Sequence, residues 1–164
     1  MRIKIKLKLL FTLFLLAVTL SAKDTLFVLP QESKQAEQKI EELIKSSRHS
    51  IEVSMYNFSL KSLAQELIQA KKRGLDVKVF LDEEKSKDKS SEYKLLKKNG
   101  IDVVLIGNTK LHTKLAIFDK KVAVFGSSNW TKESFDKNYE IIVVSQQDDV
   151  LEKLNQFIKQ LKEK

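Results

Sequence analysis

Hydrophobic residues recur along the chain with two alternating periods. From residue 25 onward, short apolar runs alternate with longer segments in which apolar residues fall three and four positions apart. This alternation indicates a β-sheet with helices packed on it. Strands are predicted at residues 25–29, 51–56, 77–81, 101–106, 111–118, 122–127 and 139–145. Helices are predicted from Ser33 to Ile44, from Leu63 to Gly74, through Leu95 and Leu96 to Gly100, and from Val150 to Leu161.

The order of these elements indicates an α/β fold. Helices join the first four predicted strands, which favours parallel pairing among them. Later, the charged turn 119–121 lies between two apolar runs and indicates a hairpin. We therefore expect a mixed, largely parallel β-sheet flanked by helices on both faces. The lysine-rich stretch 83–91 is expected to be a solvated loop.

Residues 1–22 have the layout of a secretory signal. Four basic residues precede the uncharged run 9–20, and the small pair Ser21-Ala22 follows it. A helix over that run would span roughly 18 Å, short of a ~30 Å hydrocarbon core. We expect export to the periplasm or cell envelope, with residues 23–164 as one domain. Because Leu20 stands where a smaller residue is preferred, an uncleaved membrane anchor remains the alternative.

Charge and cysteine content narrow the chemistry. The four basic residues of the N-terminal segment account for half of the formal net charge of +8, so the rest of the chain carries +4. A modestly basic domain is compatible with a polyanionic partner. Cysteine is absent, which excludes disulfides, a thiol nucleophile and cysteine-based metal sites.

Candidate chemistry concentrates between residues 112 and 140. The chain has two histidines, and His49 lies in a polar link where a solvated side chain is expected. On a strand, residues two apart face the same side, so His112 and Lys114 present an imidazole beside an ammonium group. Asp119 has the opposite parity and is expected to have a structural role.

The return strand adds a second polar group. Ser127 and Asn129 again stand two positions apart, and Gly126 allows backbone to approach a bulky anion closely. Glu140 precedes an apolar run, where a carboxylate is costly to bury without a partner. Taken singly, each of these features is ordinary for a strand edge or a turn.

Together, they resemble a known signature. The pattern His112-x-Lys114-x4-Asp119, then Gly126-Ser127-x-Asn129 and Asn138-x-Glu140, resembles that of the phospholipase D superfamily. The short chain with one motif copy is similar to the Nuc-type endonucleases, which include exported bacterial members that act on DNA. The resemblance implies a phospholipase D-like fold.

The resemblance also implies a mechanism. His112 attacks phosphorus to give a phosphohistidine, while Lys114, Ser127 and Asn129 stabilise the phosphoryl oxygens. The second imidazole, needed as general acid and base, comes from His112 of a second subunit in a homodimer. Glu140 orients a histidine of the shared site. No metal site or cofactor is expected.

Nucleic acid is the first substrate hypothesis, DNA foremost and RNA next, with a preference for single strands. Lys110 and Lys132 can contact phosphates, and Trp130, with Tyr56 and Phe135, can stack on unpaired bases. A lipid phosphodiesterase, held at a membrane by the N-terminal segment, is the second hypothesis. A nucleic-acid-binding protein without turnover is the third.

Overall fold

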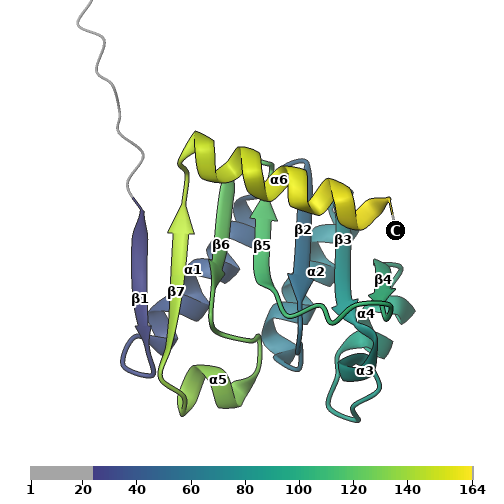
Figure 1. Ribbon diagram of the computed structural model, residues 1–164, viewed down its shortest axis with the longest axis horizontal. Coiled ribbons are helices and arrows are strands. Elements are labelled where there is room, and N and C mark those ends of the chain that lie inside the picture. Colours follow the sequence, from purple (N-terminus) through teal and green to yellow (C-terminus); the bar gives the residue numbers. More distant parts are fainter. Residues whose placement is uncertain (1–23, 164) are drawn as a thin grey trace, which may run out of the picture.

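The computed structural model describes residues 24–163, which form a seven-stranded mixed β-sheet (Figure 1). The strands are β1 Thr25–Leu29, β2 Ser50–Met55, β3 Asp76–Asp82, β4 Asp102–Ile106, β5 Lys114–Phe118, β6 Val122–Gly126 and β7 Glu140–Ser145. Across the sheet they follow the order β1-β7-β6-β5-β2-β3-β4. β2, β3 and β4 are parallel, whereas every other neighbouring pair is antiparallel.

Helices cover both faces of this sheet. They are α1 Ser33–Ser46, α2 Lys61–Lys72, α3 Glu83–Ser86, α4 Tyr93–Lys98, α5 Lys132–Asp136 and α6 Asp148–Lys162. In Figure 1, α6 crosses in front of the strands, while α1 and α2 lie behind them. Alternation along β2 matches these two layers, because Ile51 and Val53 lie in the core under α1 and α2. Glu52 faces the other way and pairs with Lys162 of α6.

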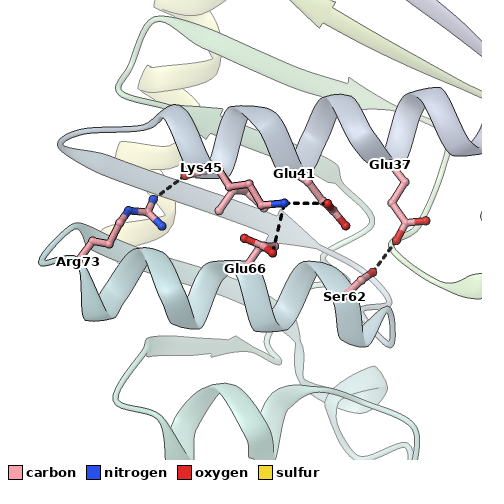
Figure 2. Close-up of polar contacts among 7 residues, drawn as sticks. Glu37, Glu41, Lys45, Ser62, Glu66 and Arg73 are labelled. Atoms are coloured by element: carbon pink, nitrogen blue, oxygen red, sulfur yellow. Dashed lines mark hydrogen bonds and ion pairs between the residues drawn. The ribbon is translucent and has the colours of Figure 1, made fainter.

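α1 and α2 lie side by side, and polar side chains join them at the surface (Figure 2). The ammonium group of Lys45 lies 3.0 Å from a carboxylate oxygen of Glu41 and 3.4 Å from one of Glu66. The hydroxyl of Ser62 donates a hydrogen bond of 2.6 Å to Glu37. Exposed ion pairs contribute little to stability, so the apolar faces of the two helices supply most of their attachment to the sheet.

The predicted fold class is confirmed, with a smaller parallel part than expected. Parallel pairing is confined to β2, β3 and β4, where helices make the connections. After β4 the chain returns to the middle of the sheet and places β5 beside β2, antiparallel to it. The β5–β6 connection is then a tight hairpin, which enforces antiparallel pairing.

The lysine-rich stretch 83–91 is not wholly a loop, and this expectation was wrong in part. It begins with the short helix α3, whose first turn is capped by Asp82 through a 3.1 Å hydrogen bond from the backbone N–H of Lys85. An aspartate at this position satisfies an amide that would otherwise lack a partner.

The β5–β6 hairpin turns on two residues with left-handed backbone, Asp119 at φ 51° and Lys120 at φ 59°. The Asp119 carboxylate accepts hydrogen bonds of 2.8 to 2.9 Å from the backbone N–H groups of Arg48, His49 and Ser50. Burial alone would raise the pKa of this carboxyl, but the three N–H donors outweigh it and the pKa is lowered. The hairpin is thereby fastened to the start of β2.

The predicted signal or anchor at residues 1–22 lies outside the described residues. Within residues 24–163, the helices are too short or too polar to cross a membrane.

Replacing Asp119 with alanine should lower the free energy of unfolding by about 2–3 kcal/mol, because hydrogen bonds to a charged acceptor are lost. Folding lowers the pKa of this carboxyl, so its contribution is present above the unfolded-state pKa of about 4. That contribution is lost as the pH falls through the folded-state value. Urea unfolding at several pH values should therefore show that the difference in free energy of unfolding between wild type and Asp119→Ala shrinks in acid.

Lys121→Ala in the same exposed turn is the matched control, with an expected change within about 0.5 kcal/mol. A loss for Asp119→Ala that is the same at all pH values would contradict the assignment.

Candidate active site

Four strand ends meet at one edge of the sheet, the lower edge in Figure 1. β2 ends there with Met55, β5 begins there with Lys114, β6 ends there with Gly126, and β7 begins there with Glu140. Antiparallel pairing of β5 with β2 and β6, and of β6 with β7, brings these ends together. His112 lies just before β5, so it belongs to the same edge.

The backbone around His112 is held on both sides. The buried residue Leu111 donates its N–H to a carboxylate oxygen of Asp82, at 3.1 Å. The carbonyl of Thr113 accepts the N–H of Tyr56 at 2.9 Å, and the hydroxyls of Thr113 and Ser54 lie 2.6 Å apart. The His112 side chain itself is exposed. The imidazole therefore projects into solvent from a fixed segment of backbone.

Tyr56 is the aromatic residue of this site. Its ring centroid lies 4.6 Å from that of His112, with the two planes inclined at 62°. Ammonium groups of Lys110, Lys114 and Lys85 lie 5.0, 5.1 and 5.9 Å from the centroid of the same ring. Distances of this size permit cation–π attraction, so Tyr56 gathers positive charge beside the imidazole.

This positive charge changes the titration of the site. The pKa of His112 is lowered by the ammonium group of Lys114, then by burial and by Lys110, while Asp82 opposes the shift. Burial lowers the pKa of Lys114, with Lys110 in the same direction and Glu140 against it. A neutral imidazole is the nucleophilic form of histidine, so the lysines favour the reactive state near neutral pH.

Ser127 and Glu140 form a pair. The Ser127 hydroxyl donates to a carboxylate oxygen of Glu140 and accepts the N–H of Ile141 at 3.1 Å. A hydroxyl has one proton, so in this arrangement Ser127 orients Glu140 instead of donating to a phosphoryl oxygen. Their approach depends on Gly126, since a Cβ there would lie 2.1 Å from the carbonyl oxygen of Ile141.

Asn129 keeps its donor end available. Its side-chain oxygen accepts the backbone N–H of Asn57 at 3.3 Å. The amide nitrogen, which can only donate, is therefore the end left for an anionic oxygen. This matches the type of group that the sequence pattern assigned to Asn129.

Two predicted stacking contacts need correction, those of Trp130 and Phe135. Trp130 is only 2% exposed and packs edge-to-face on Phe58, with ring centroids 5.1 Å apart, so it cannot stack on a base. Phe135 is equally buried in the core. Lys132 is exposed on α5, so its contact with a phosphate stays a prediction. Of the proposed binding residues, Lys110 and Tyr56 lie beside the imidazole.

The sequence interpretation also missed Asp82 and undervalued Tyr56. A usable signal existed, since both lie at the carboxyl ends of adjacent parallel strands, where α/β sheets commonly bind ligands. His49 is exposed, as expected, and precedes β2. Six residues of β2 separate it from the site, roughly 20 Å at about 3.3 Å per residue.

Two hollows lie at this site, one lined by His112 itself and the other by its neighbours Tyr56 and Lys110. One, of about 320 Å³, lies between β5, β6 and α6 and is lined by His112, Thr113, Lys114, Leu115, Phe125, Gly126, Leu154 and Phe157. The other, of about 350 Å³, is lined by Tyr56, Asp82, Glu84, Ile106, Gly107, Thr109 and Lys110. Within residues 24–163, no three His, Asp or Glu side chains gather in a manner suited to a metal ion.

Comparison with known proteins supports the resemblance. Residues 40–162 match the family described as cardiolipin synthase, PLD-like domain. The structure of NucT from Helicobacter pylori superimposes with a TM-score of 0.81 at 28% identity, over 87% of this chain and 96% of that chain. Nuc from Salmonella typhimurium, a phospholipase D family member, gives 0.77 at 27% identity, over 85% and 93% of the two chains.

Sequence comparison also finds a relative that is named as a cardiolipin hydrolase. The mitochondrial cardiolipin hydrolase of Mus musculus is 33% identical over 100 residues, which are 60% of this chain and 45% of that protein. The chain spans about half the length of the curated relatives it matches.

The protein has a mixed sheet, and one edge of it carries a His-x-Lys pair, a Gly-Ser-x-Asn turn and a glutamate. These features define a phospholipase D-like protein. The chain belongs to the phospholipase D superfamily, as a single-motif member of the Nuc type.

Replacing Lys110 with alanine should raise the pKa of His112, because one of the two ammonium groups that disfavour the imidazolium is removed. NMR titration of the His112 ring signals measures this directly, with His49 in the same spectrum as an internal reference. Lys97→Ala, an exposed lysine of α4, is the control and should leave both histidines unchanged. An unchanged pKa of His112 in Lys110→Ala would contradict the electrostatic assignment.

Proposed function

We propose that the protein is a metal-independent phosphodiesterase that hydrolyses nucleic acid, DNA with a preference for single strands, through a phosphohistidine at a site shared by two subunits. The observation that carries the proposal is the exposed imidazole of His112 with its lowered pKa, held beside the ammonium groups of Lys110 and Lys114. A neutral nucleophile among fixed cations suits attack on an anionic ester.

The first step would form a bond between a nitrogen of His112 and phosphorus while the bond from phosphorus to the leaving oxygen breaks. Lys114 and Lys110 supply positive charge for the phosphoryl oxygens, and the amide nitrogen of Asn129 can donate to them. The leaving oxygen needs a proton, which the attacking imidazole does not provide. A second acid is therefore required.

A second subunit is the best source of that acid. The chain has only two histidines, and His49 lies at the opposite end of β2 from His112. In a homodimer, the partner's imidazolium would protonate the leaving oxygen and, once neutral, take a proton from the water that breaks the phosphorus–nitrogen bond. Glu140, oriented by Ser127, would then hold one histidine of the pair in its protonated form.

Nucleic acid is favoured as the substrate by two observations. Two solved structures that resemble this chain, NucT and Nuc, are each matched over nearly their whole length. Tyr56, with three ammonium groups around its ring, combines an aromatic surface with positive charge, the pair of features that bind unpaired nucleotides. Of the three aromatic residues to which the sequence assigned stacking, Trp130 and Phe135 are buried, which leaves Tyr56 for this role.

A lipid phosphodiesterase is the second candidate. The hollow beside His112 and Lys114 has apolar walls from Phe125, Leu154 and Phe157, which can accept acyl or glycerol groups. The relative from Mus musculus is named a cardiolipin hydrolase.

Export to the periplasm or cell envelope, with or without retention at a membrane, stays a prediction from residues 1–22. Fractionation of cells that make the full chain tests this prediction.

A panel of substrates distinguishes the candidate functions: nuclease, lipid phosphodiesterase and nucleic-acid-binding protein without turnover. The purified protein is incubated with single-stranded DNA, duplex DNA, RNA and cardiolipin-containing vesicles, with and without chelator. We expect fastest cleavage of single-stranded DNA, no effect of chelator, and a loss on the order of 10³-fold or more in His112→Ala. His49→Ala, the same change at the other end of β2, should retain full activity. Cleavage of vesicles alone would favour the lipid candidate, and binding without cleavage the non-catalytic one.

Mixing subunits tests the shared site. Wild-type and His112→Ala chains are unfolded together in varied ratios and refolded at constant total concentration. If each site needs two copies of His112, activity should fall as the square of the wild-type fraction, since mixed dimers are inactive. A linear fall would mean that each subunit works alone and would overturn the dimeric mechanism.

A further inference from the structure

The carboxylate of Asp82 is buried next to the segment that carries His112. Asp82 is the last residue of β3 and is 5% exposed. One carboxylate oxygen accepts the N–H of Lys85 and the other accepts the N–H of Leu111, both at 3.1 Å. Among the ion pairs of residues 24–163, none involves Asp82. Burying a carboxylate without a cationic partner is costly, so these two backbone donors hold Asp82 in place.

The bond to Leu111 fixes the residue just before His112. Residues 107–113 have no regular secondary structure, so their position depends on individual hydrogen bonds. Between Gly107 and Leu111, the described structure has one hydrogen bond from this segment to the rest of the protein, the one to Asp82. Downstream of the histidine, Thr113 is tied to β2. His112 thus lies between two anchors, of which Asp82 is the upstream one.

A second connection from the same corner reaches the imidazole. Asp82 caps α3, a helix of four residues whose formation depends on such a cap. α3 carries Lys85, whose ammonium group lies 5.9 Å from the ring centroid of Tyr56, and that ring packs against His112. One carboxylate therefore supports both the backbone and the ring that border the nucleophile.

Asp82 also contributes charge. The groups that face His112 are Lys114 of β5, Lys110 of the preceding segment, Tyr56 after β2 and Asp82 of β3. The two lysines disfavour the imidazolium and Asp82 favours it. Glu140 of β7 acts on Lys114.

We propose that Asp82 is the positioning residue for His112: its carboxylate joins the β3–α3 corner to Leu111 and so fixes the direction from which the imidazole meets phosphorus. This rests on the proposed role of His112 as nucleophile. Asp82 touches no substrate in this scheme and acts only through the segment that it holds.

Asp82→Asn is the decisive variant. An amide has one accepting oxygen, so asparagine can keep only one of the two bonds, and with that oxygen on the α3 cap the bond to Leu111 is lost. We expect kcat on the preferred substrate to fall ~10- to 100-fold with KM changed less than about threefold, the result of a misplaced nucleophile. Loss of the anion should also lower the pKa of His112 and move the acid limb of the kcat profile to lower pH.

Two controls complete the design. Asp76→Asn makes the same change at the exposed first residue of β3 and should leave kcat, KM and the pH profile unchanged. Asp82→Glu retains the charge, so it should keep the wild-type acid limb and recover part of kcat. Equal kcat in Asp82→Asn and wild type would overturn the proposal. So would a loss of kcat that matches the loss of folded protein in thermal unfolding, with the acid limb unmoved.

NMR titration keeps this test independent of turnover. The pKa and ring chemical shifts of His112 should change in Asp82→Asn, while those of His49 stay constant. If the wild-type protein cleaves none of the substrates, the proposed function fails, yet the NMR result still decides the positioning role. Unchanged His112 signals in a folded Asp82→Asn protein would refute it.

Discussion

The pairing of β5 with β2 is the constraint on which the active site depends. β5 is the fourth strand in the order of seven and joins the parallel part of the sheet to the antiparallel part. In its register, Lys114 lies opposite Met55 and Phe118 lies opposite Ile51. A slip of one residue would exchange the two faces of β5 and move Lys114 away from Tyr56. Polar contacts secure both ends: Asp119 binds the residues that begin β2, and Thr113 binds those that end it.

The carboxylates near the site accept hydrogen bonds from neutral donors. Asp82 is held by two backbone N–H groups and Glu140 by the hydroxyl of Ser127. Because neither forms an ion pair with Lys110 or Lys114, the ammonium groups keep their charge available for a phosphodiester. Lysines then both lower the pKa of His112 and attract the anion that it would attack. In the proposed mechanism, a single electrostatic arrangement thus serves nucleophile and substrate together.

The differences between prediction and structure share a cause. Periodicity identified the strands and most helices, because which residues of an element are buried follows from local sequence. It overestimated parallel pairing, since the place of β5 depends on contacts far apart along the chain. Trp130 and Tyr56 show the same limit for side chains. Both are aromatic residues near polar motifs. In the folded protein, Trp130 packs on Phe58 in the core, whereas Tyr56 packs against the imidazole of His112.

The sequence by itself determined the alternation of strands and helices, the His-x-Lys and Gly-Ser-x-Asn spacings and the superfamily, because these depend on residue type and local period. It also limited the chain to two histidines. Tertiary structure alone decided that His49 lies at the far end of β2, that Asp82 reaches Leu111, and that Ser127 binds Glu140. These are contacts between segments distant in the chain. Their distances follow from sheet order and register, which no local pattern encodes.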